Sequence, residues 1–471
     1  MGKYKKLVSN SILFLIANFG SKVISFILVP FYTYALSTTE YGTVDILVST
    51  VSMLAPLVTL GIGDVVTLYM VKHEYDEDAI FSNSLILILG GNVILLLILP
   101  ILTMLDMFNR YIVHFFLLIL LQSLYSVLQA YVRGKGRVVS FAISGVLYTL
   151  FLVICNLLFL NYFKWGIVGY LFSMIIAYTA GCVLLLWRSE FWRVLRVRKI
   201  DKKVIQSILK LSIPLLPNSI LWWLMNISDK YTLLFFVGVS ANGLYSVGHK
   251  LPTIVSTLYS VFQQAWQLTS MEMQTKKERS EMYTKMFEVL TGAFFVATSI
   301  IIVFSKPIII LFCEETYAEA WRVVPLLTYS AVYNSLSGFI GSNYILMKNT
   351  AAALKVTTVG AIINIFLNLL LVPMMGLQGA ALATCIGFIY MVWKKMSDTQ
   401  EYTPILFERK RFFVANTLIL IQIIVVLIFD GYVFVYALSA LIILVLFCLY
   451  FDIIKEIYFK IYKKLIKGGN L

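Results

Sequence analysis

Long apolar runs separated by short polar stretches fill the chain, and this pattern predicts an all-α integral membrane protein. A helix needs about 20 apolar residues to cross a bilayer, and fourteen segments of the 471-residue sequence approach or exceed that length. The expected spans are 8–36, 43–71, 81–105, 111–132, 138–160, 166–187, 211–237, 243–271, 286–305, 321–347, 355–373, 378–397, 412–430 and 432–451.

Prolines lie inside three of these segments: Pro30 in the first, Pro56 in the second and Pro252 in the eighth. Proline removes a helix hydrogen bond and kinks the helix. The first two segments are also longer than a bilayer requires, so we expect them to be tilted or bent. Each proline marks either a packing kink or a hinge beside a cavity.

The composition agrees with a membrane protein and excludes a soluble one. Hydrophobic residues make up 60% of the chain and charged residues only 13%, against about 25% charged residues in an average soluble domain. This excludes a soluble enzyme, a disordered chain and a secreted disulfide scaffold. The net charge of +14 comes from basic residues between apolar segments. It therefore indicates membrane topology and contact with anionic membrane lipids, with no nucleic-acid partner.

The distribution of basic residues predicts the topology. If the N-terminus is cytoplasmic, thirty-one of the 38 Lys and Arg residues fall on the cytoplasmic side, including the neighbours Lys394 and Lys395. Four fall on the outer side, and three lie within spans. Lys and Arg are enriched in cytoplasmic loops. We therefore expect a multi-pass protein with an even number of spans and both termini in the cytoplasm.

The two halves of the chain carry similar signals in the same order. Gly42 and Gly243 lie in the turns before the second and eighth spans, and Asn156 and Asn368 lie late in the fifth and eleventh. Both halves begin on the same side, which predicts a parallel repeat with a central site. The expected parts are a six-helix bundle (1–187), a basic cytoplasmic linker (188–210), a second six-helix bundle (211–397), a cytoplasmic loop (398–411), two additional spans (412–453) and a basic cytoplasmic tail (454–471).

Charged residues within the spans are the candidate binding residues, because a charge at membrane depth usually faces a cavity or a partner. Lys22 lies about fourteen residues into the first span, roughly 21 Å along the helix axis. A lysine near mid-depth can line a cavity or form a structural ion pair, and we favour the cavity. Catalytic residues, a metal site and a cofactor are not expected, since the sequence lacks a phosphate-binding loop and a cluster of His and Cys.

A second group of charges lies around the turn between the seventh and eighth spans. Asp229 and Lys230 precede this turn, and His249 and Lys250 follow it at a similar distance. The two pairs therefore lie at equal depth, roughly 10–12 Å below the outer surface. They form either a structural pair, Asp229 with Lys250, or a polar gate that contacts substrate, and we favour the gate.

Three acidic residues are candidates for gating or for lining a vestibule. Glu40 and Asp45 lie at the outer turn between the first two spans, where we expect both to face water. Glu40 and Asp45 could also cap a helix or make a closing contact. Asp64 lies toward the inner end of the second span, where it either pairs with a cytoplasmic arginine or lines the inner vestibule.

Several short motifs resemble those of bacterial polysaccharide flippases, which belong to the multidrug/oligosaccharidyl-lipid/polysaccharide exporter (MOP) superfamily. Residues 36–42 (LSTTEYG) are similar to the family's L-x-x-x-E-Y-G turn. Residues 228–230 (SDK) and 243–246 (GLYS) are similar to its seventh and eighth helices, although Lys230 stands where arginine is usual. The Gly-x-x-Gly starts at 166 and 376 also match.

The resemblance implies two six-helix bundles around a central cavity in the bacterial cytoplasmic membrane. It implies a flippase, not an enzyme, that moves undecaprenyl-diphosphate-linked oligosaccharide units by alternating access for O-antigen, capsule or exopolysaccharide assembly. Its partners would be the lipid-linked oligosaccharide and other polysaccharide assembly proteins. A proton gradient, a sodium gradient and the membrane potential all stay open as the energy source.

Other functions stay open beside this one. A MATE-like drug exporter or a lipid II flippase would share the fold, but a cavity for cationic drugs is expected to be dominated by carboxylates. A membrane-embedded glycan polymerase or ligase is less well supported, because the outer loops of this chain are short.

The topology gives a first testable prediction. A cysteine placed at position 200 lies in the linker that the charge distribution assigns to the cytoplasm. In intact cells it should not react with a membrane-impermeant thiol reagent until the cells are permeabilised. Ready labelling of intact cells would overturn the topology.

Overall fold

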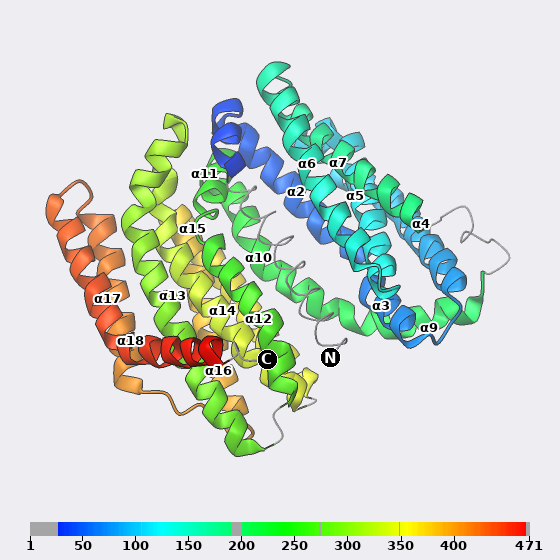
Figure 1. Cartoon of the computed structure of the whole chain (residues 1–471). Helices are drawn as coiled ribbons and strands as arrows, with labels where there is room; N and C mark the ends of the chain where they lie inside the picture. The colour runs from blue at the N-terminus through cyan, green and yellow to red at the C-terminus, as the bar shows by residue number, and fades with distance from the viewer. Residues whose placement is uncertain (1–26, 105, 190–199, 273–274, 348, 468–471) are drawn as a thin grey trace. The chain divides into compact units, whose positions relative to one another are not determined.

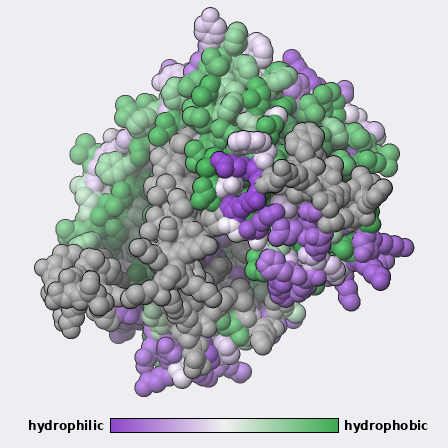
Figure 2. Space-filling view, turned by 45° about the vertical axis from the view of Figure 1, so that its right-hand side comes forward, coloured by the Kyte–Doolittle hydropathy of each residue, from purple (hydrophilic) through white to green (hydrophobic). Residues whose placement is uncertain are grey.

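The computed structural model describes residues 27–104, 106–189, 200–272, 275–347 and 349–467, and every regular element in this part of the chain is a helix. Eleven of its helical segments are long and apolar enough to cross a membrane. The predicted class, an all-α multi-pass membrane protein, is confirmed. Hydrophobic side chains cover most of the upper part of the face drawn in Figure 2, as expected for a surface in contact with lipid.

The helices fall into two compact units, each described here by itself. The first comprises residues up to Tyr231 together with Gly238–Gly243, and the second comprises Thr232–Val237 and the chain from Leu244 onward. The helices labelled in Figure 1, with the shorter turns between them, are α2 (Thr38–Val58), α3 (Ile62–Lys72), α4 (Glu77–Leu102), α5 (Asp106–Gly134), α6 (Val138–Asn156), η1 (Leu157–Tyr162), α7 (Gly166–Arg188), α9 (Lys202–Ser212), η3 (Ile213–Leu215), α10 (Leu216–Phe236), α11 (Val239–Gly248), α12 (Thr253–Glu272), α13 (Lys276–Phe312), η4 (Glu315–Val323), α14 (Val324–Leu346), α15 (Thr350–Met375), α16 (Leu377–Thr399), α17 (Arg409–Ile428) and α18 (Val433–Lys467).

Thirteen of the fourteen expected spans coincide with these helices, and the remaining one, 8–36, lies mostly outside the described residues. The segments 211–237 and 243–271 are helical but are not among the eleven apolar spans. They contain α10 and α12, whose more polar sequences suit helices that border polar surfaces as well as lipid. The predicted domain boundary at 188–210 stays a prediction.

The bend expected near Pro56 is a complete break between α2 and α3. Leu60 and Gly61 both have left-handed backbone conformations, with φ of 52° and 63°. The amide of Gly61 donates to the carbonyl oxygen of Pro56 at 2.9 Å and closes the turn. A side chain at Gly61 would also crowd Leu216, so glycine fits this break for two reasons.

A similar break separates α11 from α12 next to Pro252. Helix α11 ends at Gly248 and α12 begins at Thr253, so the expected eighth span is two helices. Proline has no N–H group to continue the helix ladder. The amides of Ile254 and Val255 donate to the carbonyls of Leu251 and Pro252 in the turn that begins α12.

Helices α3, α4, α5, α7 and α9 enclose a hydrophobic core in the first unit. Its fully buried members include Val66, Leu128, Leu185 and Ile208. Helix α9 lies partly within the basic segment that the sequence assigns to a linker. It begins at the Asp201 cap, and its buried apolar side chains join it to the first unit.

In the second unit, α14 packs against α12, α13 and α16, and α17 and α18 pack against α13. Polar bonds hold α17 and the turn that follows it against α13 and α14 at three levels. Tyr329 and Tyr333 of α14 each donate to Asn416 of α17 at 2.7 Å. The Ser299 hydroxyl donates to Gln422 at 2.6 Å. Such satisfied buried polar bonds specify which helix faces meet.

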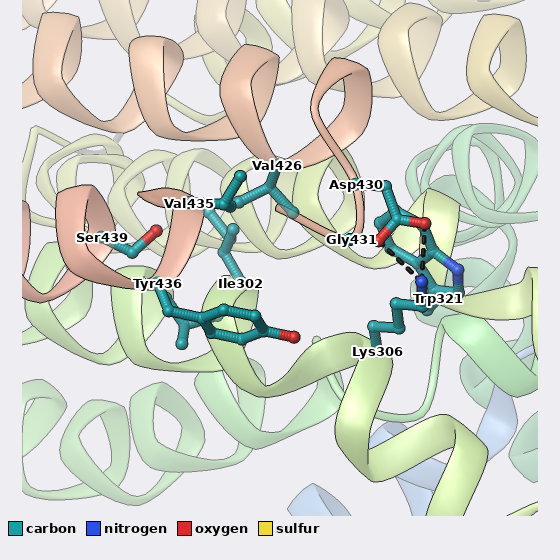
Figure 3. Close-up of a pocket in the computed structure, with 10 residues that line it drawn as sticks. Ile302, Lys306, Trp321, Val426, Asp430, Gly431, Val435, Tyr436 and Ser439 are labelled. Atoms are coloured by element: carbon teal, nitrogen blue, oxygen red, sulfur yellow. Dashed lines mark hydrogen bonds and ion pairs between the residues drawn. The ribbon is translucent and has the colours of Figure 1, made fainter. Parts of the chain in front are cut away.

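The third level is an ion pair at the turn between α17 and α18. Lys306 of α13 lies 2.6 Å from Asp430, and its ammonium group also lies 5.5 Å from the centre of the Trp321 ring. Figure 3 shows Lys306 pointing at Asp430, with Trp321 beside them and Tyr436 across a small pocket of about 20 Å³. A pocket of that size holds about one water molecule, so we assign this site a structural role.

Candidate functional site

The first turns of α2 and α11 meet backbone to backbone at a pair of glycines, and Figure 1 shows these helix ends side by side. A Cβ atom on Gly42 would lie 2.1 Å from the carbonyl oxygen of Val239, and one on Gly243 would lie 2.1 Å from that of Thr38. Any side chain at either glycine would therefore force the two helices apart. Only glycine allows backbones to approach this closely.

This contact is symmetric with respect to the sequence repeat. Thr38 and Val239 are the first residues of their helices, and Gly42 and Gly243 are the fifth. Each residue is separated from its counterpart by 201 positions. The contact is therefore self-complementary, because each helix offers the same surface to the other, as in a two-fold interface.

An ion pair lies one turn beyond Gly42 along α2. The ammonium group of Lys230, on α10, lies 2.7 Å and 2.9 Å from the two carboxylate oxygens of Asp45, on α2. Lys230 also donates to the Ser49 hydroxyl at 2.8 Å. Asn242 of α11 donates to the carbonyl oxygen of Gly42 at 3.3 Å and reaches Asp45 at 3.4 Å.

The ion pair is largely shielded from water, with 19% of the Lys230 side chain and 18% of the Asp45 side chain exposed. Partial burial strengthens the attraction between the charges but also raises the cost of desolvating them. Two hydroxyl pairs flank the ion pair: Thr38 with Ser240 and Thr50 with Tyr231, each at 2.7 Å. Polar bonds therefore hold α2 against α10 and α11.

The sequence prediction for Asp45 is wrong in one respect. We expected this carboxylate in water at the turn, but it is mostly buried and paired with Lys230. Asp45 lies only three residues beyond Gly42, and the close approach at the glycines covers that face of α2 with α10 and α11. The Asp45 carboxylate therefore offsets the positive charge of Lys230.

The structure also describes three other residues predicted near this turn. Asp229 is buried, His249 is exposed with its ring 6.5 Å from that of Tyr245, and Lys250 is half-buried. Asp229 and Lys250 belong to different compact units, so their pairing stays a prediction. Lys22 lies outside the described residues, and its role also stays a prediction.

The two remaining acidic candidates have local partners. Glu40 completes a capping box at the start of α2, where its carboxylate accepts from the Ser37 amide at 2.9 Å. Asp64 is 89% exposed and lies 3.9 Å from Arg133. Of the two roles that the sequence allowed for Asp64, this contact agrees with pairing to an arginine. Exposed ion pairs of this kind contribute about 0–1 kcal/mol.

Sequence analysis missed a buried lysine in the second unit. Lys395 was grouped with its neighbour Lys394 as a basic residue of the cytoplasmic side, but its side chain is only 3% exposed. Its ammonium group donates to the hydroxyl of Ser337, on α14, at 2.9 Å. Lys394 instead faces outward and pairs with Asp398. Consecutive residues of a helix point in directions about 100° apart, so neighbouring lysines can have opposite environments.

The two asparagines that matched in the repeat are both buried. Asn156, in the first unit, donates to the hydroxyl of Tyr32 at 3.0 Å. Asn368, in the second, donates to Asn364 at 3.4 Å, and Asn364 donates to Thr384 at 3.1 Å. Among the described residues, no group of three or more His, Cys, Asp or Glu side chains could hold a metal ion.

The ion pair makes a prediction that does not depend on what the protein transports. In the variant Ser49→Cys, adding Lys230→Asp should place two carboxylates together and separate α2 from α10. We expect the purified protein to react about tenfold faster with a maleimide at position 49, since hydrogen bonds to charged groups contribute about 1.5–3 kcal/mol. Adding Asp45→Lys should reverse the charges and restore slow labelling.

The control is the exposed pair Lys72–Glu74, whose side chains are 55% and 44% exposed. Charge reversal at Lys72 should change the labelling rate at position 49 less than twofold. Cys448, the exposed cysteine, is replaced by serine throughout. Equal labelling of the Lys230→Asp variant and its parent would show that the ion pair does not hold the helices together.

Comparison with known proteins identifies the family. The model of a family described as "Polysaccharide biosynthesis protein" matches residues 7–267, more than half of the chain. No curated protein sequence matches significantly.

Two groups of solved structures share the fold. The structure titled "Lipid II flippase MurJ, inward closed conformation" is 16% identical, covering 94% of this chain and 100% of that one with a TM-score of 0.73. An inward-facing multidrug resistance MATE family transporter of the MOP superfamily is 12% identical, covering 86% of this chain and 99% of that one with a TM-score of 0.68. The chain therefore belongs to the polysaccharide biosynthesis protein family and has the fold of the MOP superfamily structures.

Proposed function

We propose that the protein is a flippase that moves undecaprenyl-diphosphate-linked oligosaccharide repeat units across the bacterial cytoplasmic membrane for O-antigen, capsule or exopolysaccharide assembly. The observation that carries this proposal is the match to the polysaccharide biosynthesis family over residues 7–267. A membrane transporter of that family acts on a glycan attached to lipid, because the sugar must cross an apolar layer.

Under this proposal, the contact between α2 and α11 closes the outer side of the transport path. The charge distribution assigns both termini to the cytoplasm, which puts the N-terminal ends of α2 and α11 on the outer side. Alternating access requires that this contact open while an inner contact closes. The Asp45–Lys230 pair suits such a gate, because separated charges become hydrated and recover part of the energy that pairing provided.

The substrate's diphosphate calls for positive charge along the path. Lys230 is engaged by Asp45 in the closed contact, so it becomes available to an anion only when the gate opens. Lys22 and Lys250 are the further candidates, since their spans place both within the membrane. A lysine acts on phosphate as a point charge, which fits a headgroup that passes through and must also leave.

Two related activities stay as alternatives. The MurJ structure is titled a lipid II flippase and the MATE structures are titled multidrug transporters, but identities of 16% and 12% show the fold alone. A polysaccharide flippase and a lipid II flippase both move a polyprenyl diphosphate, so only the attached sugar separates them.

The decisive experiment is to delete the gene and identify the lipid-linked glycan that accumulates. We expect a polyprenyl-diphosphate oligosaccharide on the cytoplasmic leaflet and loss of one surface polysaccharide, both reversed by the intact gene. The Lys230→Asp variant, produced at the same level in the membrane, should not restore export. Accumulation of lipid II with arrest of cell-wall synthesis would contradict the proposal in favour of a lipid II flippase. Unchanged glycans with increased drug sensitivity would favour a drug exporter.

A further inference from the structure

The second unit contains a cavity that is separate from the candidate gate. It lies where α16 ends and α17 begins, beneath the loop over residues 400–408 that joins them in Figure 1. Its volume is about 450 Å³. Pockets for small molecules and cofactors typically enclose about 300–1,000 Å³, so the cavity can hold the headgroup and first carbons of a lipid.

The position of the cavity places it at a membrane boundary. Helices α16 and α17 are both membrane-spanning candidates, and the cavity lies at the last turn of one and the first turn of the other. Trp393 and Phe413 line it and stack with their rings 14° apart and 6.0 Å between centres. Tryptophan is enriched where the apolar core meets the headgroups.

Part of the cavity lining is apolar and exposed. The side chains of Leu406, Phe413 and Trp393 line it and are 71%, 54% and 37% exposed. Large apolar side chains exposed at this level provide a surface against which an acyl chain can lie. An entirely hydrophilic ligand would leave this surface uncovered.

The polar part of the lining carries one positive charge. Arg409, Ser397 and Gln400 line it, and no acidic side chain does. Two nearby acids have other partners: Glu408 pairs with Arg411 at 2.9 Å, and Asp398 pairs with Lys394 at 2.7 Å.

In the described part of the chain, Arg409 makes no ion pair. Its guanidinium group can therefore bind a phosphate through two parallel hydrogen bonds, while the hydroxyl and amide groups bind a polar headgroup.

The loop that covers the cavity is fixed in place. Ser280 of α13 donates to the carbonyl oxygen of Pro404 at 2.6 Å, and Thr284 accepts from the Leu406 amide at 2.8 Å. The ring of Tyr402 lies 4.5 Å from the guanidinium carbon of Arg279. The cavity is therefore formed before any ligand arrives, which lowers the entropy cost of binding.

We propose that this cavity binds an anionic glycerophospholipid of the surrounding membrane, with its phosphate on Arg409 and an acyl chain over Phe413 and Leu406. This inference is independent of the transported substrate, because it needs only the membrane in which the protein lies. An anionic lipid satisfies both the unpaired arginine and the apolar wall. A zwitterionic lipid brings a positive group that Arg409 repels.

The test is native mass spectrometry of the delipidated full-length protein titrated with phosphatidylglycerol or phosphatidylcholine of the same acyl chains. We expect the first phosphatidylglycerol to bind at least about fivefold more tightly, since one basic residue near a membrane surface contributes about 1 kcal/mol toward anionic lipid. Arg409→Gln should remove this preference, and Arg409→Lys should keep part of it. Phosphatidylcholine binding should change less than twofold in both variants.

The matched control is Lys410→Gln, which removes the same charge one residue away at an exposed position that does not line the cavity. It should change the phosphatidylglycerol preference less than twofold. A second variant, Ser397→Phe, keeps the charge and fills the cavity, so it should weaken phosphatidylglycerol binding as Arg409→Gln does. The melting temperature of each variant in the same detergent shows that it is folded.

Three results would overturn the proposal. Equal effects of Arg409→Gln and Lys410→Gln would show that the preference for phosphatidylglycerol comes from general surface charge and not from this cavity. Equal binding of the two lipids by the unchanged protein would show that the cavity does not distinguish an anionic headgroup. Displacement of phosphatidylglycerol by a much lower concentration of undecaprenyl phosphate would assign the cavity to the polyprenyl carrier instead.

Discussion

The close approach of Gly42 and Gly243 is the constraint on which the candidate gate depends. Because neither residue has a side chain, the first turn of α2 can lie directly against the first turn of α11. That approach brings Asp45 within reach of Lys230 and Asn242, and Thr38 within reach of Ser240. A side chain at either glycine would separate all of these pairs at once.

The contact combines polar pairing with backbone packing, and this combination suits a reversible closure. A contact made of large apolar side chains would expose hydrophobic surface to water each time it opened, at about 25 cal/mol for each Å². Asp45, Lys230 and the flanking hydroxyls can exchange their bonds with one another for bonds with water. A substrate or ion that binds the open state more tightly than the closed state can therefore open the contact, because this difference in affinity shifts a two-state equilibrium.

The sequence predicts the class and thirteen of the described helical segments, because these depend on local hydrophobicity. It also identifies Asp45 and Lys230 as candidates, but it does not pair them. Their partnership follows from contacts between residues about 185 positions apart, and hydropathy contains no information on such contacts. The burial of Lys395 is missed for a related reason, since which face of α16 meets α14 is decided by packing.

The spacing of the repeat, however, contains more information than it first suggests. Gly42 and Gly243 are separated by 201 positions, and so are Thr38 and Val239, the first residues of their helices. A repeat about a two-fold axis brings equivalent positions together near that axis. Glycines at equivalent positions in the two halves could therefore have been predicted to face each other.

The most direct test of the gate is a reversible crosslink at its rim. The hydroxyl oxygens of Thr38 and Ser240 lie 2.7 Å apart and are exposed, so sulfur atoms at these γ positions are close enough to form a disulfide. In cells that produce Thr38→Cys with Ser240→Cys, oxidation should stop glycan export, and an impermeant reductant should restore it. Each single-cysteine variant should export normally under both conditions. Continued export by fully crosslinked protein would contradict the account.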